Sequence, residues 1–162
     1  PYENLFILPD RVYDVCMNKD KKVLIALRIA MGFIFLWAFI DKTFGLGFAT
    51  SAGKAWIDGA SPTAGFFFFF FEGPLAGLFQ SMAGVAIVDW LFMAGLLFVG
   101  ITLLLNKYVR WGSIVGSIML ALMYLSLMLP ENNPIIDEHI IYILVLLLIA
   151  STSNNNGELV RQ

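Results

Sequence analysis

The chain has 162 residues, of which 59% are hydrophobic and 14% are charged, and its formal net charge is −2. A soluble globular domain carries about 25% charged residues, so this composition excludes an ordinary soluble domain and indicates an all-α integral membrane protein. No basic cluster indicates a nucleic-acid partner. One cysteine and one histidine exclude an intrachain disulfide and a haem or iron–sulfur ligand set, and no flavin site is evident.

Four apolar segments predict a four-helix membrane bundle that forms one domain over residues 23–150. A polar arm at residues 1–22 precedes this domain and a polar tail at residues 151–162 follows it. We interpret the arm as cytoplasmic and not as a cleaved signal peptide. The short link between the second and third spans predicts a helical hairpin. The first three spans are predicted at about residues 23–44, 85–105 and 109–129.

The fourth span is predicted at residues 134–150, with Asn133 as its N-cap and Pro134 as its first residue. The uninterrupted apolar run from Ile140 to Ala150 measures only about 16 Å as a helix, whereas a bilayer core is about 30 Å thick. A spanning helix must therefore start upstream and include three ionisable residues, Asp137, Glu138 and His139.

The connection between the first and second spans, residues 45–84, is predicted to lie on the outer side. It contains six consecutive phenylalanines, Phe66–Phe71. This run is too apolar for water and too short to cross a bilayer, so we expect an interfacial or re-entrant segment. The alternative is that this homopolymer does not belong to the gene sequence.

The distribution of Lys and Arg predicts the orientation of the spans, because cytoplasmic loops carry the excess of these residues. With the N-terminus inside, only Lys42 and Lys54 fall on the outer side. Arg28 lies one to two turns inside the first span, and we expect it to reach back to the cytoplasmic interface. The inner side collects Arg11, Lys19, Lys21, Lys22, Arg28, Lys107, Arg110 and Arg161.

This orientation places ionisable residues from three helices at one outer end. Ionisable groups in or beside a bilayer are costly and by default mark functional sites. The members of this cluster are Asp41, Lys42, Asp89, Asp137, Glu138 and His139.

Each member of the cluster also has a purely structural interpretation. Asp41 and Lys42 can form an interfacial ion pair, which we consider the better interpretation for these two residues. A carboxylate at Asp137 or Glu138 is favoured by the positive end of a helix dipole. His139 can be a hydrogen-bonded packing residue, although a single histidine beside two acids favours a functional role.

Acid–base chemistry fits this cluster better than metal binding. Sequential residues on a helix point about 100° apart and cannot converge on one ion. A quinone headgroup, in contrast, needs a proton-carrying histidine or carboxylate within hydrogen-bond reach and a lipid-open apolar slot. Glu138 and Tyr142, four residues apart, can line one face of such a slot. The candidate catalytic residues are His139, Asp89, Glu138 and Asp137, and the candidate quinone or substrate pocket comprises Asp41, Lys42, Trp90 and Tyr142.

Four segments of the chain resemble the DoxX family of small four-helix prokaryotic membrane proteins, and within it the DoxD-like branch. The resemblance covers about residues 23–150. It is carried by Leu27–Trp37 followed by Asp41-Lys42, by Trp56–Pro62, by Val88–Phe92, and by Pro130–Pro134 followed by Asp137-Glu138-His139.

The resemblance implies a multi-pass protein of the prokaryotic cell membrane, related to the large subunit of thiosulfate:quinone oxidoreductase. Such a subunit moves electrons from a reduced sulfur compound, such as thiosulfate, to membrane quinone together with a second protein subunit. The resemblance adds no catalytic residue to those named above.

The alternative hypothesis is a non-catalytic structural or assembly subunit of a larger membrane enzyme complex. Such a subunit could pack through the Phe-rich loop and through Gly112-x-x-x-Gly116, a small-xxx-small pattern that lets helix backbones approach closely. A proton-coupled carrier has little support, because no acid is expected at mid-membrane and no discontinuous repeat pair is evident.

Overall fold

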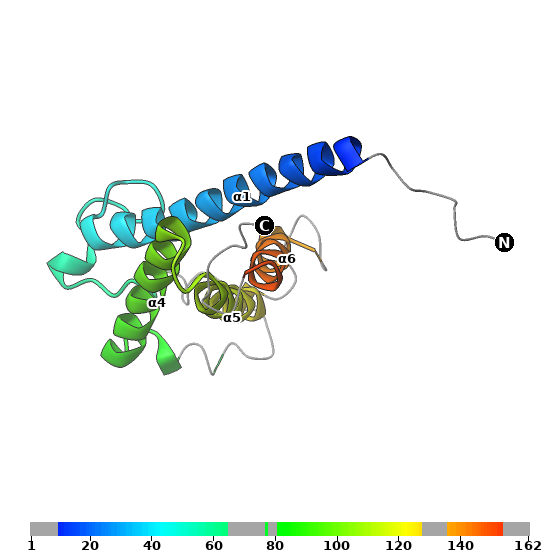
Figure 1. The fold of residues 1–162 in the computed structure, drawn as a ribbon. Helices are drawn as coiled ribbons and strands as arrows, with labels where there is room; N and C mark the ends of the chain where they lie inside the picture. The colour runs from blue at the N-terminus through cyan, green and yellow to red at the C-terminus, as the bar shows by residue number, and fades with distance from the viewer. Residues whose placement is uncertain (1–9, 65–76, 78–80, 128–135, 154–162) are drawn as a thin grey trace.

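The computed structural model describes residues 10–64, 77, 81–127 and 136–153, and every regular element within these ranges is a helix. Figure 1 shows the long helices α1, α4, α5 and α6. The prediction of an all-helical chain is therefore confirmed for the described residues. The predicted Phe66–Phe71 and Asn133–Pro134 features lie outside them. The elements are α1 (Asp10–Phe44), η1 (Trp56–Asp58), α4 (Ala86–Leu105), α5 (Val109–Leu127) and α6 (Glu138–Ser151).

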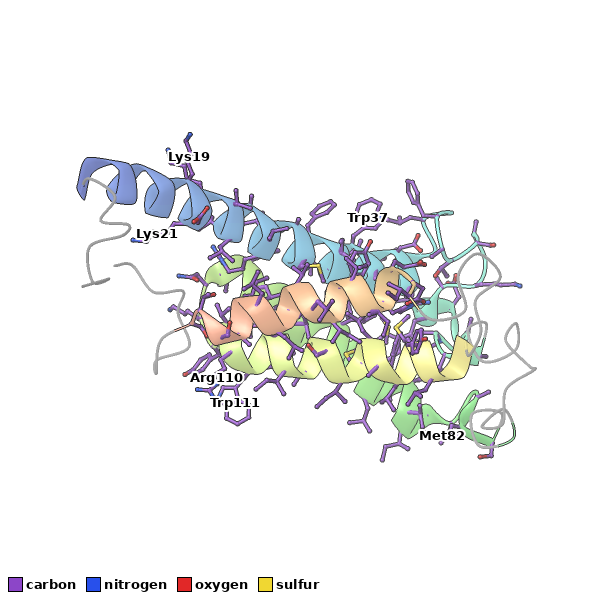
Figure 2. All side chains as sticks on the ribbon, turned by 90° about the vertical axis from the view of Figure 1, so that its right-hand side faces the viewer. Lys19, Lys21, Trp37, Met82, Arg110 and Trp111 are labelled. Atoms are coloured by element: carbon purple, nitrogen blue, oxygen red, sulfur yellow. The ribbon has the colours of Figure 1, made fainter. Side chains whose placement is uncertain are left out.

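The four long helices alternate in direction and form a closed ring of packed neighbours. α1 packs on α4, α4 on α5, α5 on α6, and α6 on α1. Figure 2 shows the helices running side by side, with the N-terminal part of α1 projecting past the other three. We call the end that holds residues 106–108 the turn end, and the end that holds residues 45–64 the loop end.

The turn between α4 and α5 confirms the predicted helical hairpin. Asn106 ends α4 in the left-handed conformation, with φ 56°, and its N–H donates to the carbonyl of Thr102. Asparagine tolerates this conformation better than most residues, so the chain can reverse within three residues. The two helices that this turn joins are consequently antiparallel.

Every long helix contributes to one apolar core inside the ring. Leu103, Val109, Leu146 and Ile149 have no exposed surface. The core consists of Met31 and Phe35 from α1, Met93, Leu96, Val99 and Leu103 from α4, Val109 and Leu120 from α5, and Leu146 and Ile149 from α6.

Glycines allow the helices to approach closely around this core. A Cβ atom at Gly100 would lie 2.9 Å from the backbone nitrogen of Leu36, so α4 touches the backbone of α1 there. A Cβ at Gly116 would lie 2.9 Å from Leu146 Cδ1 and 3.2 Å from Val99 Cγ1. The predicted small-residue pattern of α5 therefore serves contacts within the chain at Gly116.

α1 and α6 differ from the predicted spans in where they begin. α1 is helical from Asp10, because no Gly or Pro interrupts residues 10–22. α6 begins at Glu138 and not at Pro134, because the Asp137 side chain accepts a hydrogen bond from the Ile140 N–H and caps the helix there. The 14-residue α6 is about 21 Å long.

Arg28 is buried within the bundle, and its side chain reaches the turn end of α4. It is 7% exposed, and its Nη1 donates to the carbonyls of Leu103 and Leu104 in the last turn of α4. The last carbonyls of a helix lack partners within the helix and carry partial negative charge, which a guanidinium satisfies. Arg28 thus joins α1 to the end of α4.

Two helices are long and apolar enough to cross a membrane: Lys19–Phe44 and Ala86–Leu105. Only 22% and 39% of their most apolar windows are buried, so most of their apolar side chains face outward. Val109–Leu125 and Glu138–Ser151 are apolar but shorter. Large apolar side chains are exposed on these helices as well, including Ile118, Leu122, Leu144 and Leu147.

We expect Gly100→Ala to destabilise the fold, although alanine is favoured over glycine in helices by about 1 kcal/mol. The new methyl group would meet the Leu36 backbone, which cannot move aside, and such overpacking costs about 1–3 kcal/mol. The matched control is Gly95→Ala, where the methyl group meets the flexible end of Met119. Thermal unfolding followed by circular dichroism should show a lower midpoint for Gly100→Ala alone. Equal midpoints would contradict the close contact.

Candidate functional site

The predicted cluster of ionisable residues lies at the loop end of the bundle. Asp41 and Lys42 are in the last turn of α1, and Asp89 is in the first turn of α4. Asp137 and His139 are at the start of α6. Figure 2 shows these helix ends gathered at one end of the molecule, beside the 45–64 loop.

Asp41 holds the first part of the 45–64 loop. The residue is 1% exposed, and its carboxylate accepts hydrogen bonds from two backbone groups, Phe48 N–H at 3.3 Å and Thr50 N–H at 2.8 Å. Both carboxylate oxygens are used in these bonds. Backbone N–H groups thus satisfy the hydrogen-bonding capacity of this buried carboxylate, which gives Asp41 a structural role.

Asp89 holds the last part of the same loop. The residue is 6% exposed, and one carboxylate oxygen accepts from Ser61 Oγ at 2.8 Å, from Thr63 Oγ1 and from Thr63 N–H. Its place in the first turn of α4 also suits a negative charge, because the N-terminus of a helix is positive. Asp89 therefore joins the loop to α4.

Lys42 does not form the expected ion pair with Asp41. Its Nζ lies 3.4 Å from the carbonyl of Pro62 and 5.8 Å from the centre of the Phe92 ring. A cation over an aromatic face is attracted by the ring quadrupole. Lys42 consequently contributes a third contact between α1, the loop and α4.

Trp90 lies against the loop as well. Its ring contacts Trp56 of η1 edge-on, with 4.6 Å between the ring centres. Such edge-to-face pairs add about 0.5–1.5 kcal/mol beyond the area that they bury. Trp90 remains 65% exposed on its other side, so in the described structure it does not line an enclosed pocket.

His139 and Asp137 form a close histidine–carboxylate pair. His139 Nδ1 lies 2.7 Å from Asp137 Oδ2, and the two side chains are 11% and 7% exposed. Because a carboxylate only accepts, Nδ1 carries a proton and donates it. In the neutral ring, Nε2 is then the proton acceptor. This arrangement orients the imidazole ring, as in acid–base catalytic sites.

Asp137 has a second function, because its other oxygen accepts the Ile140 N–H at 3.2 Å. Burial on its own would raise the pKa of this carboxyl group. The hydrogen bonds from His139 and from the Ile140 backbone outweigh burial, and the pKa is lowered from its ordinary value. Asp137 is therefore a carboxylate at neutral pH.

Glu138 and Tyr142 do not share one environment, although they are four residues apart on α6. Glu138 is exposed, whereas Tyr142 is partly buried against the core. The described residues contain no group of three or more His, Cys, Asp or Glu side chains that could hold a metal ion.

The partners of the acids were not identified from the sequence. Ser61 and Thr63 flank Pro62 in a turn, and their hydroxyl groups were not connected to Asp89. The sequence did contain one indication of these bonds. An acid, Asp89, lies in an apolar segment, and a turn rich in hydroxyl groups precedes that segment. No comparable signal pointed to the amides of Phe48 and Thr50, since any residue supplies a backbone N–H.

We expect Asp89→Ala to destabilise the 45–64 loop. The buried hydroxyl and N–H groups of Thr63 would lose their acceptor, which costs about 1–3 kcal/mol. Hydrogen exchange at the Thr63 amide should accelerate, and the free energy of unfolding should fall. The matched control is Asp58→Ala, an exposed acid in η1, with an expected change within about 0.5 kcal/mol. Unchanged exchange at Thr63 in Asp89→Ala would contradict the anchoring role.

We expect the Asp137 pair to make the fold sensitive to acid. Because the folded pKa is lowered, its stabilisation is complete above the unfolded value of about 3.9 and is lost as the pH falls through the folded value. Asp137→Asn keeps a good N-cap but removes this titration. Its thermal midpoint in detergent should fall less steeply below about pH 4 than that of the wild type. Glu138→Gln, which removes an exposed carboxyl, should retain the wild-type slope. An identical slope in Asp137→Asn would refute this assignment.

No family model, curated protein or solved structure matches this chain. The functional interpretation therefore rests on the geometry of the loop end. This end contains two buried carboxylates that hold a loop, and one histidine–carboxylate pair with the geometry of an acid–base site.

Proposed function

We propose that this protein is a multi-pass membrane subunit of a quinone-reactive oxidoreductase, of the kind that its DoxX-like motifs imply. In this proposal it passes electrons from a reduced sulfur compound, such as thiosulfate, to membrane quinone at the loop end. The observation that carries the proposal is the buried hydrogen bond between His139 and Asp137.

The outward-facing apolar side chains support the membrane location. A helix in the core of a soluble protein is mostly buried, whereas the two candidate spans bury a minority of their apolar windows. Exposed aromatic residues lie toward both ends of the bundle, as in the aromatic belts of membrane proteins. They are Trp37 and Trp90 toward the loop end, and Tyr108 and Trp111 at the turn end.

The charges support an orientation with the turn end on the cytoplasmic side of the membrane. Six described Lys and Arg residues lie toward the turn end, and Lys42 and Lys54 lie at the loop end. Positive residues concentrate on the cytoplasmic side of membrane proteins. The six are Lys19, Lys21, Lys22, Arg28, Lys107 and Arg110.

His139 suits proton transfer to or from a quinone. When bound, a quinone supplies the carbonyl groups that accept electrons and protons. Within the described part of the chain, the hydrogen bond of His139 is made by Nδ1, so Nε2 is available to a ligand. Nε2 of His139 would hold a quinone carbonyl oxygen by a hydrogen bond and could supply its proton, while Asp137 orients the ring. His139 could then be reprotonated from the aqueous side.

Electron balance requires a partner subunit. Reduction of a quinone to a quinol takes two electrons and two protons, and the sulfur compound releases the electrons. The second subunit binds this compound on the outer side. The residues of this chain hold the quinone and move its protons.

A second candidate function is a non-catalytic assembly subunit. The observation that favours it is that Asp41, Asp89 and Lys42 all form hydrogen bonds with the 45–64 loop. Three of the eight candidate site residues then have a structural role only. In this case the loop end is a rigid surface for another subunit.

Substitution of the pair tests the proposal. In a complex purified with its partner subunit, His139→Gln should lower thiosulfate-dependent quinone reduction by about 10²–10⁴-fold, the usual contribution of a general acid–base. Asp137→Asn should also lower turnover, because an amide can donate to Nδ1 and move the ring proton to Nε2.

The matched control is Asp58→Asn, an exposed acid in η1, which should leave turnover unchanged. Wild-type turnover in His139→Gln would remove this residue from the reaction. Co-purification with a larger enzyme that keeps full activity in all three variants would establish the assembly function in its place.

A further inference from the structure

The α4–α5 turn presents two cations and two aromatic side chains on one exposed surface. We call Lys107, Tyr108, Arg110 and Trp111 the turn patch. All four are exposed, with Tyr108 at 64% and Trp111 at 63%. Figure 2 shows Arg110 and Trp111 directed outward at this end of the bundle.

The helix ends explain why these side chains point outward. Asn106 and Tyr108 both have φ 56°, so the chain reverses tightly between Leu105 and Val109. Val109 is fully buried and fixes the start of α5 in the core. The residues on either side of Val109 are therefore directed away from the core.

The turn patch lies in a region of positive charge. The exposed residues Lys19 and Lys22 of α1 lie toward the same end, and Asp20 is the only acid there whose side chain is described. Figure 2 places Lys19 and Lys21 at the end that holds Arg110. The loop end has the opposite balance among described side chains, with Lys54 as its one exposed cation beside exposed Asp58 and Glu138.

Apolar surface adjoins the turn patch directly. Leu105 is 65% exposed at the end of α4, and Ile118 is 55% exposed two turns into α5. This surface is apolar along the helices, aromatic at their ends and cationic beyond them. A bilayer changes in the same order, from acyl chains through the interface to charged headgroups. The cations lie where lipid phosphates would be.

From this arrangement we propose that the turn patch binds the headgroups of anionic phospholipids. Arg110 presents a planar fork that suits phosphate oxygens, and Lys107 adds a point charge. Tyr108 and Trp111 fix the depth of the turn at the interface. The inference rests on the proposed function for the membrane location alone, and it does not require quinone chemistry.

Lipid retention tests the proposal. The full chain is placed in nanodiscs of equal phosphatidylglycerol and phosphatidylcholine, and the lipids that stay bound after mild delipidation are counted by native mass spectrometry. The wild type should retain more phosphatidylglycerol. Lys107→Gln and Arg110→Gln should each lower the ratio of the two lipids by about fivefold, the effect of one basic residue near an anionic surface.

The matched control is Lys54→Gln, which removes one exposed cation at the loop end and should leave the ratio unchanged. Raising the salt to about 1 M, where the Debye length is about 3 Å, should reduce the preference of the wild type. Equal retention of both lipids by the wild type would overturn the proposal, as would an equal effect of Lys54→Gln. A contact between copies that depends on Arg110 but not on lipid would also overturn it.

The outcomes separate this inference from the membrane proposal. A chain that does not enter nanodiscs of phosphatidylcholine alone would refute the membrane location and this inference together. A chain that enters them but shows no lipid preference would refute the lipid site alone. Neither result depends on quinone reduction.

Discussion

The close contact between α1 and α4 determines how the rest of the molecule is arranged. At Gly100 the absence of a side chain lets α4 touch the backbone of α1 at Leu36. Two further contacts keep the same antiparallel register, Gly32 against Leu104 and Lys42 over Phe92. Because packed helices cannot slide past such contacts without a clash, the end of α1 is fixed against the start of α4. The 45–64 loop is consequently held between two helix ends at a constant separation.

The loop explains why buried acids at a helix end need not be catalytic. Asp41 and Asp89 are buried as deeply as the His139 pair, yet their partners are loop hydroxyls and backbone amides. A carboxylate satisfied in this way contributes to folding, since its removal leaves buried donors without an acceptor. His139 and Asp137 differ because their hydrogen bond uses Nδ1 of the ring and leaves Nε2 for a ligand. This difference, and not burial, distinguishes the candidate acid–base site from the structural acids.

The sequence predicted the parts of the fold that depend on apolar periodicity and strong turn signals. The second and third spans agree with α4 and α5 within two residues at each end, because the apolar runs end at Asn106. The predicted start of α6 at Pro134 was wrong, because the Asp137 side chain caps a helix that begins at Glu138. The partners of Arg28 were not predicted, because a carbonyl at the end of another helix is not visible as a pattern. The loop that holds Asp41 and Asp89 has no periodicity, so its contacts could not be predicted.

Asp137 uses one oxygen to cap α6 and the other to hold His139. A single carboxylate thus joins the position of the imidazole ring to the order of a helix terminus. The cap of α6 and the orientation of the ring depend on the same side chain. A ligand that drew this carboxylate away from either partner would loosen both. An event at the ring would therefore be accompanied by a change in the rigidity of the backbone beside it.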